Sequence, residues 1–151
     1  MIKKLAILLV VIISIASGCN AKKPVEKIYL SDKYYNAGEF IKVESEYLNG
    51  NTKENYVLYT YNDFCSFKIP CDKIFLEFME KYKIDFLSIP FEEFKNTSLY
   101  NKVRYAPSVI VVKSGEVVGY LDAEADEDLY RYQSVSAFEE WITKYIEVTK
   151  E

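Results

Sequence analysis

The feature that most constrains the fold is a strand–helix–strand pattern between residues 56 and 89. The run YVLYTY (56–61) is aromatic and β-branched and is bounded by asparagines, which indicates a buried strand. Residues 72–83 place apolar side chains at helical spacing, and IDFLSI (84–89) is the next apolar run. Two strands joined by a helical crossover are expected to be parallel. The pattern therefore predicts an α/β protein.

The rest of the chain continues this alternation. SVIVV (108–112) and EVVGYL (116–121) flank a tight Lys-Ser-Gly turn, which predicts a hairpin. The remaining apolar patterns predict a short helix over 39–49, a less regular helix over 91–103, and an amphipathic helix over 136–146 with Ser136 as N-cap. We therefore expect a mixed central sheet of about four to five strands with helices on both faces.

Composition excludes several classes of function. The chain has 151 residues, which suits one domain, and its net charge is −4 with scattered Lys and Arg. No basic stripe is visible, so no nucleic-acid partner is expected. The sequence has no histidine, which excludes His-based acid–base catalysis, Ser-His-Asp triads and His-ligated metals. Two thiolates without histidine lack the four ligands that zinc requires, so no metal site is expected.

The N-terminus has the pattern of an export signal. Two lysines precede an apolar run of 11 residues, Leu5 to Ile15, which is too short to predict a membrane-spanning helix. The following Ala16-Ser17-Gly18-Cys19 resembles a bacterial lipobox. That resemblance implies cleavage before Cys19 and attachment of fatty acyl chains such as palmitate to its sulfur. An ordinary signal peptide with a coincidental cysteine is the alternative.

This interpretation divides the chain into three parts. Residues 1–18 are expected to be a lipoprotein signal peptide, 19–37 a membrane tether, and 38–151 the folded domain. The mature protein is then expected on the extracytoplasmic face of the cell membrane, held there through a lipid on Cys19. In that compartment, the remaining Cys65 and Cys71 can be oxidised.

Those two cysteines lie between the first strand of the pattern and its helix. Ligands of α/β sheets bind at the carboxyl ends of strands, near helix N-termini. The positive end of a helix dipole lowers the pKa of a nearby thiol and so raises its thiolate fraction.

Residues 56–146 resemble the thioredoxin fold, and the whole chain is similar to thioredoxin-like lipoproteins of Gram-positive bacteria, including bacteriocin-transport accessory proteins. The residues that carry this likeness are the strand YVLYTY, Cys65 beyond it, the helix FLEFMEKYKID, and YAPS before SVIVVKSGEVVGYL. The resemblance implies that Pro107 is cis and faces the redox cysteine, and that the backbone of Ala106 pairs with a substrate peptide. It also implies no dissociable cofactor, a cysteine-containing extracytoplasmic protein or peptide as substrate, and a redox partner protein.

The sequence departs from the family at the redox motif. The family has C-x-x-C, whereas this chain has C-x5-C. Aligned without gaps, Cys65 takes the nucleophilic position and Lys68 the resolving one. The buried acid of the family falls at Tyr59. Phe64 occupies the position before the first cysteine, where the family usually has Trp.

Geometry decides whether the two sulfurs can meet. In a continuous helix, six residues separate them by about 9 Å of rise, beyond the reach of a disulfide. Pro70 favours the first turn of a helix, so the helix is predicted to start at Pro70 or Cys71 and to leave 66–69 as a loop. Three hypotheses remain open for the pair: a redox-active dithiol, a structural disulfide in a non-catalytic binding protein, or two independent thiols.

Overall fold

The computed structural model describes residues 26–62 and 70–150. Within them, one mixed sheet has the strand order β1-β3-β2-β4-β5. The strands are β1 (Phe40–Lys42), β2 (Asn55–Tyr61), β3 (Phe86–Pro90), β4 (Ser108–Lys113) and β5 (Glu116–Tyr120). β1 and β2 run parallel to β3, whereas β4 is antiparallel to β2 and β5 is antiparallel to β4. The predicted mixed sheet, its parallel β2–β3 pair and its terminal hairpin are confirmed.

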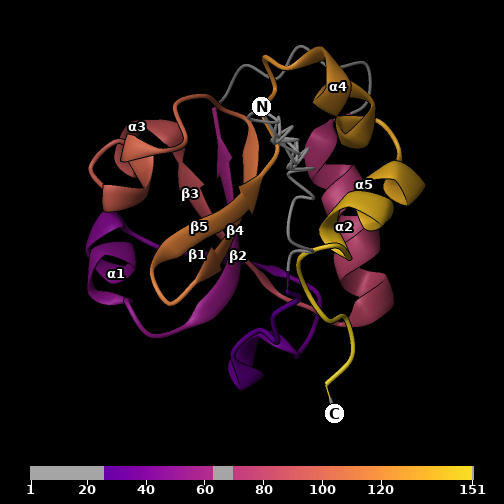
Figure 1. The fold of residues 1–151 in the computed structure, drawn as a ribbon, viewed down its shortest axis with the longest axis horizontal. Coiled ribbons are helices and arrows are strands. Elements are labelled where there is room, and N and C mark those ends of the chain that lie inside the picture. The colour runs from indigo at the N-terminus through magenta and orange to yellow at the C-terminus, as the bar shows by residue number, and fades with distance from the viewer. Residues whose placement is uncertain (1–25, 63–69, 151) are drawn as a thin grey trace, which may run out of the picture.

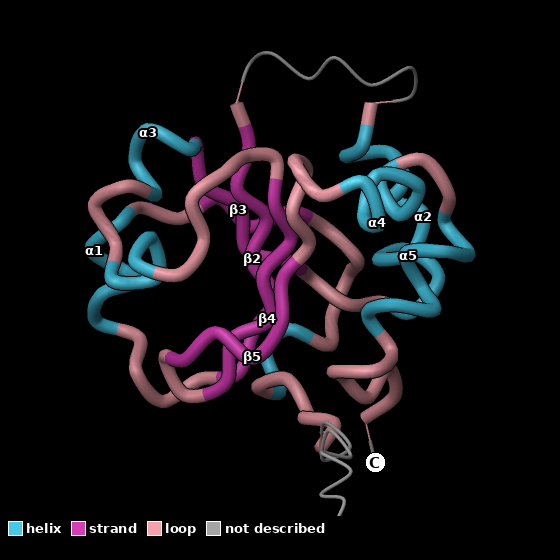
Figure 2. The backbone as a smooth tube through the Cα atoms, turned by 45° about the horizontal axis from the view of Figure 1, so that its top comes forward, coloured by secondary structure: helices cyan, strands magenta, loops and turns pink. Residues whose placement is uncertain are grey.

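Helices cover both faces of the sheet, as predicted. The α-helices are α1 (Ser45–Gly50), α2 (Cys71–Tyr82), α3 (Phe91–Phe94), α4 (Asp126–Leu129) and α5 (Val135–Ile142). Short 3-10 turns are η1 (Asp32–Tyr34), η2 (Ser98–Asn101) and η3 (Tyr130–Tyr132). α1 and α3 lie on one side of the sheet, and α2, α4 and α5 lie on the other (Figures 1 and 2).

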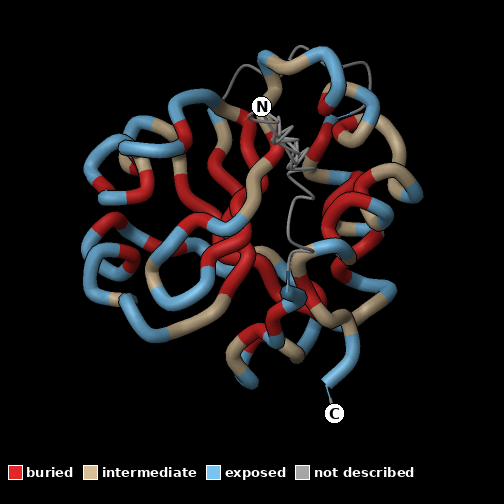
Figure 3. Tube along the Cα trace, viewed as in Figure 1, coloured by how far each residue is buried: buried red, intermediate tan, exposed pale blue. Residues whose placement is uncertain are grey.

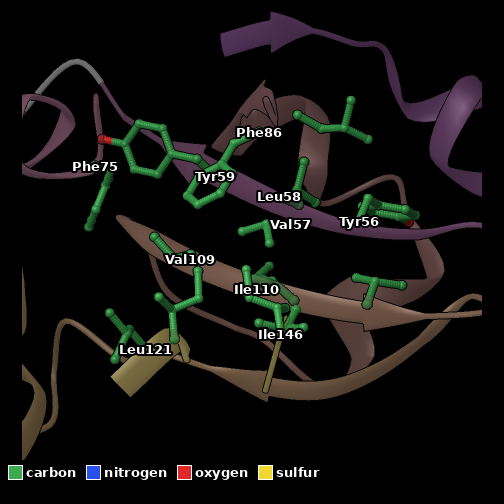
Figure 4. Packing of buried hydrophobic residues seen from close by; sticks show 14 of the residues in the cluster. Tyr56, Val57, Leu58, Tyr59, Phe75, Phe86, Val109, Ile110, Leu121 and Ile146 are labelled. Carbon is green, nitrogen blue, oxygen red and sulfur yellow. The ribbon is translucent and has the colours of Figure 1, made fainter. Parts of the chain in front are cut away.

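The core lies on both sides of the central strand β2. Tyr56 to Thr60 are each no more than 7% exposed, which explains why this strand is a continuous apolar run. Burial is concentrated in the strands and in the helix faces that meet them (Figure 3). Val57 and Tyr59 of β2 lie beside Val109 of β4 and Phe75 of α2 (Figure 4). Aromatic contacts, including Phe75–Phe138 at 4.7 Å between ring centroids, join α2 to α5.

The short helix predicted within 39–49 is present as α1, but it occupies only the second half of that range. Residues 40–42 form the edge strand β1, which pairs in register with Phe86, Leu87 and Ser88 of β3. The helix α1 begins only at Ser45. Three residues carry little local signal for a strand, so pairing with β3 decides the conformation of this segment.

Two other predicted helices differ in their bounds. The helix expected over 91–103 is broken at Thr97, which is extended and whose hydroxyl donates to the carbonyl oxygen of Phe94 (2.8 Å). The last helix begins at Val135, with Ser134 and not Ser136 as N-cap, because the Ser134 hydroxyl accepts the N–H of Ala137 (3.4 Å). The predicted N-cap at Ser136 is therefore wrong by two residues.

The folded body includes part of the stretch that was expected to be a tether. Ile28 forms a parallel bridge with Ile146, and both are buried. Leu30 and Tyr34 are also part of the core. The domain therefore extends to residue 28, ahead of the boundary expected at residue 38.

Candidate functional site

The candidate site lies where the carboxyl ends of β2 and β3 meet the start of α2. Figure 2 shows the end of β2 and the first turn of α2 at the same end of the molecule. Cys71 is the first residue of α2, and Pro70 is its N-cap. The prediction that the helix starts at Pro70 or Cys71 is confirmed. A fixed φ and a missing N–H suit proline to this position, and the helix dipole then points its positive end at Cys71.

The thiol of Cys71 is buried against β2. Cys71 as a whole is 1% exposed. The Sγ atom lies 3.3 Å from the hydroxyl oxygen of Tyr59, and either atom can be the donor. Tyr59 is the position at which the resemblance places a buried acid. The structure therefore brings a phenol to the thiol in place of a carboxylate.

An open pocket of about 430 Å³ reaches this thiol. The described residues that line it are Phe40, Tyr59, Tyr61, Asn62, Pro70, Cys71, Asp72 and Ser88, of which three are aromatic and one is an acid. The ring of Tyr59 lies 5.3 Å from that of Phe40 and 5.7 Å from that of Tyr61, centroid to centroid. The pocket thus combines an aromatic cluster with polar side chains, and Cys71 is part of its lining.

The segment before β4 closes another side of the site. The Ala106–Pro107 peptide bond is cis, as predicted. The Asn62 side chain donates to the carbonyl oxygen of Ala106 (3.4 Å). The hydroxyl of Tyr132 contacts the carbonyl oxygens of Pro107 (2.9 Å) and Leu121 (3.0 Å).

Tyr132 connects this segment to the thiol. Burial, followed by the charges of Asp128 and Cys71, raises the pKa of Tyr132 well above its ordinary value. Asn62 lines the pocket together with Cys71 and contacts Ala106, and the rings of Tyr132 and Tyr59 both pack against Phe75. The structure therefore brings Cys71 and the 106–107 segment to one end of the sheet.

Two of the predicted site residues lie outside the described residues. Cys65 falls within 63–69, and Cys19 within 1–25. Their pairing or lipid attachment therefore stays a prediction. None of the helices in the described ranges is long and apolar enough to span a membrane.

Within residues 26–62 and 70–150, no group of three or more His, Cys, Asp or Glu residues lies close enough together to hold a metal ion. Of the acidic residues between 122 and 128, Asp126, Glu127 and Asp128 form the first turn of α4. Its Asp128 is buried, accepts the N–H of Asp122 and pairs with Arg131, which is an ordinary structural arrangement.

Sequence reasoning missed three residues of the site. Phe40 was placed in a helix, whereas it begins the edge strand β1 and lines the pocket. Asn62 was taken only as the boundary of a strand. Tyr132 is one of fourteen tyrosines, and no local pattern distinguishes it from the others.

The strand order, the helices on both faces and the cis proline before β4 together define a thioredoxin-like fold.

Solved thioredoxins are similar in structure. A thioredoxin of Schistosoma mansoni is 21% identical, with a TM-score of 0.49, over 74% of this chain and 99% of that one. A mutant thioredoxin of Halobacterium salinarum is 19% identical, with a TM-score of 0.49, over 76% and 97% of the two chains. No family model and no curated protein sequence matches this chain.

Proposed function

We propose that this protein is a lipid-anchored, extracytoplasmic thiol–disulfide oxidoreductase that uses Cys65 and Cys71. One observation carries the proposal: Cys71 is the first residue of α2, it belongs to the lining of a pocket, and its sulfur lies 3.3 Å from a hydroxyl oxygen. A helix N-terminus favours a thiolate, the species that performs exchange.

The exchange proceeds in two steps. The Cys65 thiolate attacks a substrate disulfide, forms a mixed disulfide, and releases one substrate sulfur, which takes up a proton. The Cys71 thiolate then attacks the Cys65 sulfur, forms the Cys65–Cys71 disulfide, and releases the second substrate thiol. Two electrons pass from the pair to the substrate, and a dithiol of a redox partner protein restores them. The reverse sequence oxidises a substrate dithiol.

The substrate is an extended segment of a cysteine-containing extracytoplasmic protein or peptide. The backbone of Ala106 and the ring of Pro107 hold it, as the resemblance implies. The neighbouring Tyr105 is 50% exposed and offers an apolar contact beside them. A lipid on Cys19 keeps the enzyme at the membrane.

Trapping tests the exchange. In the full chain expressed in its membrane, Cys71→Ser should accumulate mixed disulfides through Cys65, because the resolving sulfur is missing. Non-reducing gels and mass spectrometry measure the adducts. The double variant Cys65→Ser, Cys71→Ser is the control and should form none. If the single variant forms no more adducts than the double one, exchange through Cys65 is wrong.

A non-catalytic binding protein with a structural disulfide is the second candidate. It is favoured by the burial of Cys71, since a 1% exposed sulfur also suits a structural role. The reduction potential of the pair separates the two. A structural disulfide of an exported protein lies below about −300 mV, whereas an exchange-active one is more oxidising. Replacing both cysteines should preserve binding in this second case.

A further inference from the structure

The contact between Tyr59 and Cys71 joins a strand to a helix start inside the core. Tyr59 is 7% exposed and Cys71 is 1% exposed. The tyrosine ring is held by Phe75 of α2 (5.3 Å, edge-to-face) and by Phe40 and Tyr61. This packing fixes where the hydroxyl points, so the 3.3 Å contact is a defined feature of the site.

The direction of this hydrogen bond depends on the charge of the sulfur. When Cys71 is a neutral thiol, either the S–H or the O–H can donate. A thiolate has no proton, so only the phenol O–H can then donate. Hydrogen bonds to an ionised acceptor are roughly twice as strong as neutral ones. The contact therefore stabilises the thiolate more than the thiol.

The other titratable groups around Cys71 do not supply this stabilisation. Asp72, next to it on α2, is negative and disfavours a second negative charge. Tyr61 of β2 lines the same pocket, and β1 and β3 contribute only the uncharged Phe40 and Ser88. None of the described pocket residues is a cation.

From η3, the ring of Tyr132 packs against Phe75, which also contacts Tyr59. The hydroxyl of Tyr132 donates its hydrogen bond toward the carbonyl oxygens of Pro107 and Leu121. Asp128 of α4 acts on Tyr132 and adds further negative charge. Among the printed contacts of Cys71 with described residues, the Tyr59 hydroxyl and the N-terminus of α2 are the ones that favour a charged sulfur.

We propose that Tyr59 is the hydrogen-bond donor that stabilises the Cys71 thiolate through its hydroxyl. A tyrosine thereby takes the place that the resemblance assigns to a buried acid, but it acts as a neutral donor and not as a base. In the exchange reaction, on whose assignment this catalytic role rests, it accelerates the attack of Cys71 on the Cys65 sulfur. The ionisation of Cys71 itself is independent of that assignment.

The titration of Cys71 tests the proposal directly. The full chain carries Cys19→Ser and Cys65→Ser, so that Cys71 is its one cysteine. The ¹³Cβ chemical shift of labelled cysteine then reports ionisation against pH. Tyr59→Phe keeps the packed ring and removes the hydroxyl. We expect the midpoint to rise by about one pH unit, which lowers the thiolate fraction about tenfold at neutral pH.

Tyr56→Phe is the matched control. Tyr56 is a buried tyrosine of the same strand, and its hydroxyl makes no hydrogen bond among the described residues. Its removal should leave the Cys71 midpoint unchanged. If Tyr59→Phe shifts the midpoint no more than Tyr56→Phe does, the proposal is wrong.

A second measurement does not depend on a variant at Tyr59. The ¹³Cζ signal of labelled Tyr59 should move over the pH range in which Cys71 ionises, and this movement should vanish in Cys71→Ser. A Tyr59 signal that ignores the ionisation of Cys71 would contradict the proposal. Both titrations are read without substrate, so failure of the exchange reaction would leave their outcome intact.

Discussion

Asp85 is a buried carboxylate that fastens a loop to the sheet. It precedes β3 and is 2% exposed. Its Oδ1 accepts the backbone N–H groups of Ala37 (3.1 Å), Gly38 (2.7 Å) and Glu39 (2.9 Å). Gly38 has a φ of 86°, and a Cβ there would lie 2.5 Å from the carbonyl oxygen of Met79, so this turn requires glycine. One side chain thus orients three consecutive amides just before β1.

The charge of Asp85 links stability to pH. Burial acts to raise the pKa of Asp85, but the hydrogen bonds from Glu39, Asn36, Gly38 and Ala37 outweigh it and lower that pKa below its ordinary value. A lowered pKa contributes stability above the unfolded value of about 4, and the contribution is lost as the pH falls. We expect Asp85→Asn to lose about 1–3 kcal/mol at pH 7.

Urea unfolding at several pH values measures this effect. The parental chain should lose stability below about pH 4 more steeply than Asp85→Asn. Asp72→Asn replaces an acid that is not buried, and it should change the free energy of unfolding by about 0.5 kcal/mol or less. Equal pH dependence in the parental chain and in Asp85→Asn would contradict this assignment.

At the scale of single elements, local signals predicted β2, α2, β3 and the β4–β5 hairpin. Each carries its own pattern: a two-sided apolar run, helical spacing, or a tight turn in which Ser114 and Gly115 both have positive φ. β1 could not be found in this way, because its strand character comes from β3, which lies far along the chain. The residues of the candidate site fall into the same two groups: those that a local pattern predicts and those that only contacts with distant segments bring into the site.

The start of α2 was predicted from Pro70 itself, and the cis Pro107 was expected from the resemblance of the YAPS segment to the thioredoxin fold. Phe40 and Tyr132 enter the site only through the folding of β1 and η3 against distant segments. Two serines two residues apart also gave no means of choosing the N-cap of α5, since both are good capping residues.

The cap of α5 is open to a direct comparison. Ser134 is extended and its hydroxyl accepts the N–H of Ala137, whereas Ser136 lies within the helix. We expect Ser134→Ala to lower the free energy of unfolding by about 1 kcal/mol. Ser136→Ala should change it by about 0.5 kcal/mol or less. Thermal or urea unfolding of the two variants measures the difference, and a larger loss in Ser136→Ala would overturn the assignment of the cap.

At the scale of the whole molecule, the two ends of the described chain are joined. The N–H of Ile28 donates to the carbonyl of Tyr145 (2.8 Å), and the N–H of Glu147 donates to the carbonyl of Ile28 (2.9 Å). Tyr35 adds a hydrogen bond from its hydroxyl to the carbonyl of Glu147 (2.8 Å). Residues 20–27 are polar and contain Pro24, a pattern that predicted a tether and not this pairing.

The contribution of this pairing to stability is measurable. Ile28 is 4% exposed, so Ile28→Ala should cost about 2–5 kcal/mol through lost burial and a residual cavity. Lys27→Ala, next to it, removes an exposed side chain 3.9 Å from Glu147 and should cost about 1 kcal/mol or less. Urea unfolding of the two variants measures the difference. If the two substitutions lower the free energy of unfolding equally, the burial of Ile28 would not stabilise the fold as described.

Under the proposed lipid anchor on Cys19, this pairing would also orient the protein at a membrane surface. The described chain starts at the end of the molecule opposite the first turn of α2 (Figure 2). Six residues lie between Cys19 and Glu26, and the seven steps from one to the other reach about 25 Å at most. With acyl chains on Cys19, the Ile28 pole would rest near the lipid headgroups, and the mouth of the cysteine pocket would look outward, where exported proteins pass.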